Sequence, residues 1–202
     1  MFNKHVWSNR RHKIEVFLCN TEVIGSIVNF ESNIILVNPK SEILSALYSE
    51  GKIKNINSIN TIVLTNKSIE CSRGLCSVMN YFKVMRRRKV LTVITRNDAY
   101  AISMNNWCLK MFSGSIFPTK FVTLKINKNF IYNDLNLSFK NYESEIDKIF
   151  LKISSKVHNL YYLDSDSKFD FLQKIDSEID VIINEFKLEK AAKLIKYELE
   201  IV

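Results

Sequence analysis

The sequence predicts an α/β protein of one domain, built as a four-layer αββα sandwich in which two sheets are covered by outer helices. The order of patterns carries this prediction: strand-like runs come first, strands and helices then alternate, and strands return before a closing helix. The 202 residues contain no internal repeat, linker or low-complexity tract, and a chain of this length can bury a substantial core. A doubly wound parallel sheet is the rival fold, but it accounts poorly for the all-strand start.

Each element follows from its local pattern. Short runs rich in β-branched and aromatic residues predict strands, and apolar residues at helical spacing predict helices. The continuous run "NTIVLT" at 60–65 is typical of a strand covered on both faces. The predicted strands are 13–19, 22–30, 33–38, 60–65, 89–95, 120–126, 130–142, 148–154, 159–166 and 180–186. The predicted helices are 41–51, 72–87, 96–112, 168–175 and 187–202.

The composition indicates a folded chain, with 47% apolar and 25% charged residues. The four cysteines show no disulfide-framework spacing, and no apolar run approaches the roughly 20 residues that span a bilayer. The basic N-terminus lacks the apolar region of a signal peptide. We therefore expect a reduced, cytoplasmic compartment and no membrane partner.

The formal net charge of +8 is concentrated in residues 3–13 and in "KVMRRRK" at 83–89. Such clusters can bind partners that carry phosphates or carboxylates, and arginine suits this contact because its planar fork binds oxyanions. We therefore expect Arg86, Arg87 and Arg88 to form a partner-binding surface. The competing interpretation is a solvated helix end whose charges stabilise the helix dipole.

The stretch "TNKSIECSRGL", residues 65–75, resembles the loop of the metallo-β-lactamase superfamily that reads T-H-x-H-x-D-H-x-x-G-L. Thr65 precedes the loop and Gly74-Leu75 follows it, with the same loop length. The four metal-binding positions all differ, and Asn66, Ser68, Glu70 and Cys71 stand at them. The run "YYLDSD" looks like the superfamily's "YxGDt", which implies that Asp164 stands at the metal-bridging aspartate.

The degenerate loop is similar to that of one branch, the coenzyme PQQ biosynthesis protein B family. Further matches lie upstream in "ILVNPKSEILSAL" and downstream in "LTVITRNDAYAISMNNWCLKMF". Together the matches span roughly residues 13–186 in the right order. The resemblance implies a metallo-β-lactamase-like domain over residues 13–202, preceded by a basic extension over 1–12. It also implies a homodimer as one expected assembly, because members of the superfamily often dimerise.

Superfamily catalysis needs metal ions held by converging imidazoles and carboxylates. None of the three histidines stands at a ligand position, so we expect no cofactor. A rebuilt site for zinc or iron would have to use Glu70, Cys71 and Asp164. Cys71 and Cys76 form a C-x4-C pair without a second pair, which argues against a structural zinc site. Met104, Trp107 and Met111 are interpreted as core or helix-packing residues and not as a ligand site.

Three functions remain open. The first is a catalytically inactive protein of this fold that acts as a binding or assembly subunit for a protein or peptide. The second is an enzyme with a rebuilt metal site that acts on a peptide-derived substrate, as the PQQ branch implies. The third is an RNA- or nucleotide-binding protein, since other branches of the superfamily process RNA and "RRRK" is basic.

Overall fold

The computed structural model describes residues 1–8, 12–20, 22–30, 33–111, 117–132, 134–142, 145–155, 159–163, 181–184 and 200–201. The chain forms two compact units, one of residues 1–123 with 201–202 and one of residues 124–200. Each unit contains one sheet. The rival fold with a single parallel sheet is therefore wrong.

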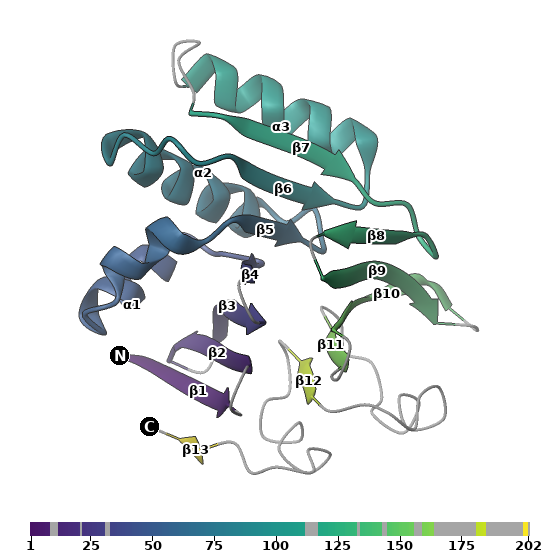
Figure 1. Ribbon diagram of the computed structural model, residues 1–202, viewed down its shortest axis with the longest axis horizontal. Coiled ribbons are helices and arrows are strands. Elements are labelled where there is room, and N and C mark those ends of the chain that lie inside the picture. Colours follow the sequence, from purple (N-terminus) through teal and green to yellow (C-terminus); the bar gives the residue numbers. More distant parts are fainter. Residues whose placement is uncertain are drawn as a thin grey trace. The chain divides into compact units, whose positions relative to one another are not determined.

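The first unit is built on an eight-stranded sheet with the order β13-β1-β2-β3-β4-β5-β6-β7 (Figure 1). Its strands are β1 (Phe2–Ser8), β2 (His12–Cys19), β3 (Glu22–Phe30), β4 (Asn33–Val37), β5 (Thr61–Leu64), β6 (Leu91–Thr95), β7 (Thr119–Thr123) and β13 (Glu200–Ile201). Strands β1 to β4 pair antiparallel in sequence order. Strands β4 to β7 pair parallel, so their carboxyl ends share one edge.

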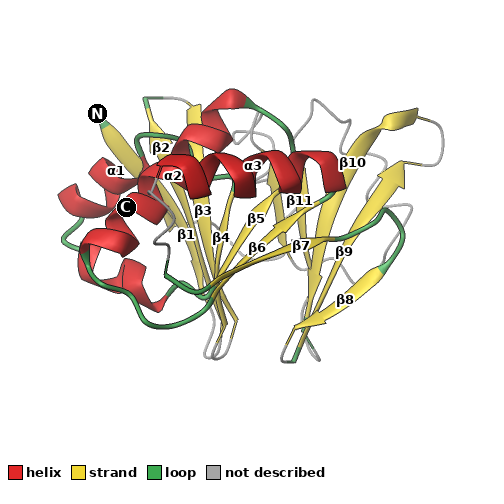
Figure 2. Ribbon diagram, turned by 90° about the horizontal axis from the view of Figure 1, so that it is seen from above, coloured by secondary structure: helices red, strands yellow, loops and turns green. Residues whose placement is uncertain are grey.

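Three helices and a 3-10 turn lie between the parallel strands in sequence: α1 (Ile43–Ser49), η1 (Ile53–Ser58), α2 (Ile69–Val84) and α3 (Asp98–Met111). Figure 2 shows the three α-helices on the same face of the eight-stranded sheet. The apolar faces of α1 and α2 contribute Ala46, Leu47, Leu75, Val78 and Phe82 to the core, where they pack with sheet residues such as Leu36, Ile62 and Val93. Every residue of β5 and β6 is buried, as the continuous apolar runs predict.

Helix α2 lies unusually close to the backbone that follows β4. A Cβ atom built on Gly74 would stand 1.9 Å from the carbonyl oxygen of Pro39. Only a residue without a side chain fits at this point of the helix. The pair Gly74-Leu75 therefore has a packing role: Gly74 permits the approach, and Leu75 is fully buried in the core.

The second unit holds a five-stranded sheet with the order β12-β11-β10-β9-β8. Its strands are β8 (Asn129–Tyr132), β9 (Leu135–Tyr142), β10 (Glu145–Ser154), β11 (Asn159–Leu163) and β12 (Val181–Asn184). Neighbouring strands from β8 to β11 pair antiparallel, whereas β11 and β12 pair parallel. Leu137, Phe139, Leu151 and Ile153 are fully buried at alternating positions of β9 and β10.

The structure changes the expectation at both ends of the chain. Residues 2–8, which lie in the predicted basic extension, form β1 and pair with β2 along its length. Residues 200–201 form a strand at the end of the predicted closing helix, so the helix prediction is wrong there. The predicted helix at 168–175 lies outside the described residues. No helix in the part of the chain that the structure describes is both long and apolar enough to cross a membrane.

Candidate functional site at the carboxyl edge of the parallel strands

The loop that resembles a metal-binding loop begins where β5 ends, and Asn38 fixes its first residue. The Asn38 side chain donates from Nδ2 to Thr65 Oγ1 at 2.6 Å and accepts from the Thr65 amide at 2.8 Å. The backbone amide of Asn38 donates to the Val63 carbonyl at 3.0 Å. Asn38 has a φ of +44°, a conformation that asparagine tolerates better than most residues. These bonds tie the ends of β4 and β5 together in a fully buried position.

The first two of the four ligand positions are used to start helix α2. Asn66 Oδ1 accepts from the amide of Ser68 at 3.0 Å. Ser68 Oγ in turn accepts from the amide of Cys71 at 3.1 Å, which makes Ser68 the N-cap. Both side chains therefore satisfy backbone donors of the loop and of the first helical turn.

The side chains at the other two ligand positions point in different directions. Glu70 is exposed and lies 3.3 Å from the guanidinium of Arg73, one turn along the helix. Cys71 is 1% exposed and belongs to the core under α2. In this structure Glu70 faces the surface and Cys71 faces the core, so the two side chains do not converge on one point.

The described residues do not fit the metal that the resemblance of the loop implies. They contain no group of three or more histidine, cysteine or acidic side chains placed to hold an ion. Asp164, the third member of the predicted rebuilt site, lies outside the described residues, as does His158. Asn66 and Ser68 are poor ligands for zinc, and both are engaged by the backbone.

The sequence did not predict that the hydroxyls of Ser72 and Tyr100 lie together next to the loop. Ser72 Oγ donates to the Ser68 carbonyl at 3.0 Å and lies 2.7 Å from the hydroxyl of Tyr100 in α3. Burial raises the pKa of Tyr100, and the hydrogen bond to Ser72 partly offsets this. Tyr100 is placed by the amide oxygen of Asn97, which accepts from the Tyr100 amide at 2.9 Å. Ser72 lies in the helix that follows β5, and Tyr100 lies in the helix that follows β6. The two hydroxyls meet because β5 and β6 are neighbours in the sheet, which the sequence alone does not show.

A depression of about 460 Å³ lies beside the loop. It is lined by Cys19, Asn20, Glu22, Ile24, Lys40, Glu42 and Glu70. Three of these side chains are carboxylates and one is a lysine, whose ammonium lies 3.9 Å from Glu22. Glu70 therefore belongs to an acidic surface depression and not to an enclosed ligand cage.

The structure divides the three arginines predicted to bind a partner. Arg86 and Arg88 are exposed, whereas Arg87 is only 8% exposed. The Arg87 guanidinium donates to four backbone carbonyls: those of Ile59 at 2.7 Å, Asn57 at 2.8 Å, Lys89 at 2.9 Å and Val90 at 3.4 Å. It also stacks on the ring of Phe82, 4.4 Å from the centroid. Arg87 therefore holds the turn in place, whereas partner binding by the arginines stays a prediction.

Helix α2 ends in a Schellman motif, and this motif positions the three arginines. The amide of Arg87 donates to the Phe82 carbonyl at 2.9 Å, and the amide of Arg86 donates to the Lys83 carbonyl at 3.0 Å. Arg86 occupies the left-handed position of this motif with a φ of +51°, where glycine is usual. The turn thus presents Arg86 and Arg88 outward and turns Arg87 inward.

Comparisons with known proteins identify the fold. No family model matches the sequence, and no curated protein matches it. Among solved structures, the metallo-beta-lactamase fold protein YhfI from Bacillus subtilis matches with a TM-score of 0.59 and 12% identity, over 90% of this chain and 69% of YhfI. Human tRNase Z, short form, matches with a TM-score of 0.58 and 12% identity, over 84% of this chain and 74% of the other.

A third similar structure is a peroxy diiron species of the chemotaxis sensor ODP, with a TM-score of 0.52 and 10% identity over 94% of this chain and 72% of the sensor. The chain therefore has the metallo-β-lactamase fold, which confirms the predicted fold class. At such low identities the likeness establishes the fold alone. Metal binding in ODP is a property of that protein.

Proposed function

We propose that this chain is a metallo-β-lactamase-fold protein without a catalytic metal site, and that it acts as a binding or assembly subunit for a protein or peptide. One observation carries the proposal. The residues at the four ligand positions of the loop serve other purposes: Asn66 and Ser68 start a helix, Glu70 pairs with Arg73 at the surface, and Cys71 packs in the core.

Recruiting these residues to an ion would disturb the structure around them. Turning Ser68 away from the Cys71 amide would remove the N-cap of α2, which costs about 1 kcal/mol. Bringing Cys71 to the surface would take a fully buried side chain out of the core, at about 1–2 kcal/mol. Metal affinity would have to exceed both costs without an imidazole ligand from the described residues of the loop.

The proposed partner-binding surface is the basic turn, defined here as Arg86, Arg88 and Lys89. All three side chains are exposed and follow the C-terminus of α2. Like charges so close together repel one another, and a partner that carries carboxylates or phosphates relieves this repulsion. Arg87 supports the surface because its bonds to four carbonyls hold the turn in place.

Elemental analysis of protein purified without chelator or affinity histidines tests the absence of a catalytic metal. We expect zinc, iron and manganese each below about a tenth of an equivalent per chain, because affinity for such ions depends on a converging ligand set. Stoichiometric metal that disappears in Cys71→Ala or Asp164→Ala would refute the proposal. It would favour the enzyme with a rebuilt site, related to the PQQ biosynthesis branch and acting on a peptide-derived substrate.

Site-specific photo-crosslinking tests the basic turn. A photo-reactive residue at Arg88 should capture a protein partner in cells, whereas one at the exposed Lys120 of β7 should not. The charge-removing variant Arg86→Gln/Arg88→Gln/Lys89→Gln should weaken that capture. If the same variant instead lowers RNA binding and flattens its salt dependence, the RNA-binding alternative is correct. Equal capture at both positions would rule out the basic turn as the binding surface.

A further inference from the structure

Helices α2 and α3 each carry a cysteine followed three residues later by a methionine. These pairs are Cys76 with Met79 in "CSVM" and Cys108 with Met111 in "CLKM". Residues three apart lie on the same side of a helix. Each helix therefore presents one thiol and one thioether along one side.

Tertiary packing brings the sulfur atoms of the two helices together. Cys108 Sγ lies 3.4 Å from Met79 Sδ, and both residues are fully buried. Cys76 is a neighbour of Cys108, and each thiol shifts the pKa of the other. The interaction with Cys108 and then burial raise the pKa of Cys76, whereas the interaction with Cys76 lowers the pKa of Cys108.

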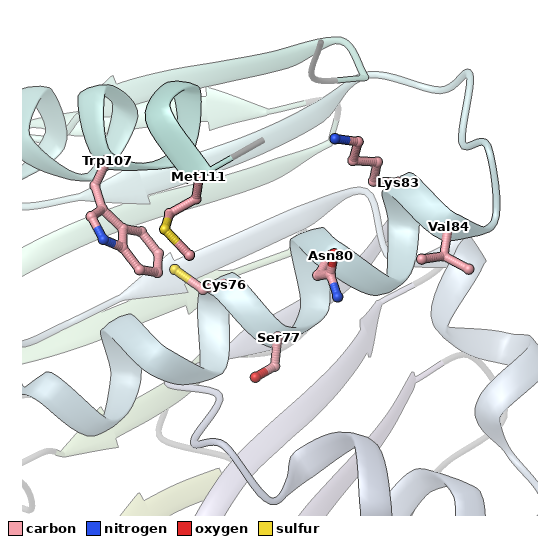
Figure 3. Close-up of a pocket in the computed structure, with 7 residues that line it drawn as sticks. All are labelled: Cys76, Ser77, Asn80, Lys83, Val84, Trp107 and Met111. Atoms are coloured by element: carbon pink, nitrogen blue, oxygen red, sulfur yellow. The ribbon is translucent and has the colours of Figure 1, made fainter. Parts of the chain in front are cut away.

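The cluster opens to solvent through a cavity of about 570 Å³ between the two helices. Figure 3 shows the sulfur of Cys76 directed toward Trp107 and Met111, which line the same cavity. Met111 is 61% exposed and Trp107 is 40% exposed, so both side chains are accessible to solvent. An ion can therefore reach Cys76 and Met111 first, with Cys108 and Met79 behind them.

We propose that Cys76, Met79, Cys108 and Met111 form a binding site for a soft monovalent cation, Cu(I). Thiolate and thioether donors select Cu(I), whereas zinc sites use thiolate, imidazole and carboxylate. Two sulfur atoms that each bind one ion at about 2.3 Å stand about 3.8 Å apart in a tetrahedral site. The 3.4 Å between Cys108 and Met79 is within a few tenths of an ångström of that separation.

Binding balances as an exchange of protons for the ion. Two thiols lose two protons and one Cu(I) is bound, which leaves a net charge of −1 on a dithiolate complex. Lys83 lines the same cavity, farther along α2 from Cys76 (Figure 3). No electron is transferred in this step. The cavity is lined by residues of α2 beyond the first turn that carries Glu70, and the site is independent of the function proposed above.

Anaerobic titration of the reduced protein with Cu(I) held by bicinchoninate tests the site. We expect one equivalent of Cu(I) to transfer to the protein, with sulfur as the only donor in X-ray absorption spectra. Cys76→Ser and Cys108→Ser should abolish the transfer. Met79→Leu, which keeps the side-chain volume, should weaken binding about tenfold to a hundredfold. Cys19→Ser, at a half-buried thiol in β2, is the matched control and should bind as the unchanged protein does.

Several results would overturn the proposal. These are no transfer to the unchanged protein, tight binding by Cys76→Ser or Cys108→Ser, and loss of binding in Cys71→Ser as large as that in Cys76→Ser. Met111→Leu keeps the test decisive if a core variant fails to fold, because Met111 is exposed and its replacement leaves the core unchanged. Normal copper affinity in a folded Met111→Leu protein would remove this residue from the site and reject the four-sulfur arrangement.

Discussion

Replacing Arg87 with methionine removes the guanidinium but keeps a flexible apolar stem against Phe82. Three backbone carbonyls then lose a charged donor at 2.7–2.9 Å, and a fourth loses a longer contact. The bond to Ile59 is buried and is worth about 2 kcal/mol, whereas the two partly buried bonds are worth about 1 kcal/mol each because water can replace them. Because the methionine stem keeps apolar contact with the ring, we expect a total loss of about 4 kcal/mol, which is the sum for these bonds.

Such a loss is a large fraction of the roughly 5–15 kcal/mol that stabilises most domains. For a chain of this size it corresponds to a fall in Tm of roughly 8–16 °C. Urea denaturation followed by circular dichroism measures the loss as a lower midpoint at unchanged slope. Arg87→Lys keeps the charge but lacks the planar fork, and should lose about half as much.

Arg88→Met is the matched control, because Arg88 is exposed and adjacent in sequence. Its effect should stay within about 0.5 kcal/mol. If Arg87→Met is no less stable than Arg88→Met, the bonds to the carbonyls contribute nothing and the structural role assigned to Arg87 is wrong.

Three further predictions follow from the same unit. Gly74→Ala should fail to fold or lose more than about 3 kcal/mol by urea denaturation, whereas Gly51→Ala, with open space around it, should lose about 1 kcal/mol from its φ of +67°. Asn38→Leu should lower the free energy of unfolding by about 2–3 kcal/mol, because the buried Thr65 amide loses its acceptor. If the same replacement at an exposed asparagine costs as much, this reasoning is wrong. Burial lowers the pKa of His5, so stability should fall as pH drops from about 6.5 toward the lower folded pKa; His5→Gln should flatten this pH dependence in denaturation at pH 5 and pH 7.

The sequence predicted an element correctly where the residues of that one segment show its burial pattern. The apolar runs of β4, β5 and β6 and the side-chain spacing of α2 reflect local burial and need no knowledge of distant residues. Strand β1 was missed because "FNKHVWS" carries charge and lacks the alternation of polar and apolar residues that marks a half-buried strand. Pairing with β2 makes this segment a strand.

The candidate sites were harder to predict because they depend on tertiary placement. Arginine is usually exposed, so a run of three gave no sign that Arg87 is buried against four carbonyls. The pairing of Cys76 with Cys108 depends on how α2 and α3 pack, and the sequence offered only the nearer pair, Cys71 and Cys76. The degenerate loop was recognisable because Thr65 and Gly74 keep its frame.

That frame has a consequence for redesign. Asn38, Thr65 and Gly74 hold the loop through buried hydrogen bonds and a close backbone approach, and none of the three stands at a ligand position. A histidine introduced at Asn66 would leave these three residues in place, although it would remove the acceptor of the Ser68 amide. Cys71 sets the limit, because an imidazole at that position would have to leave the core to reach an ion.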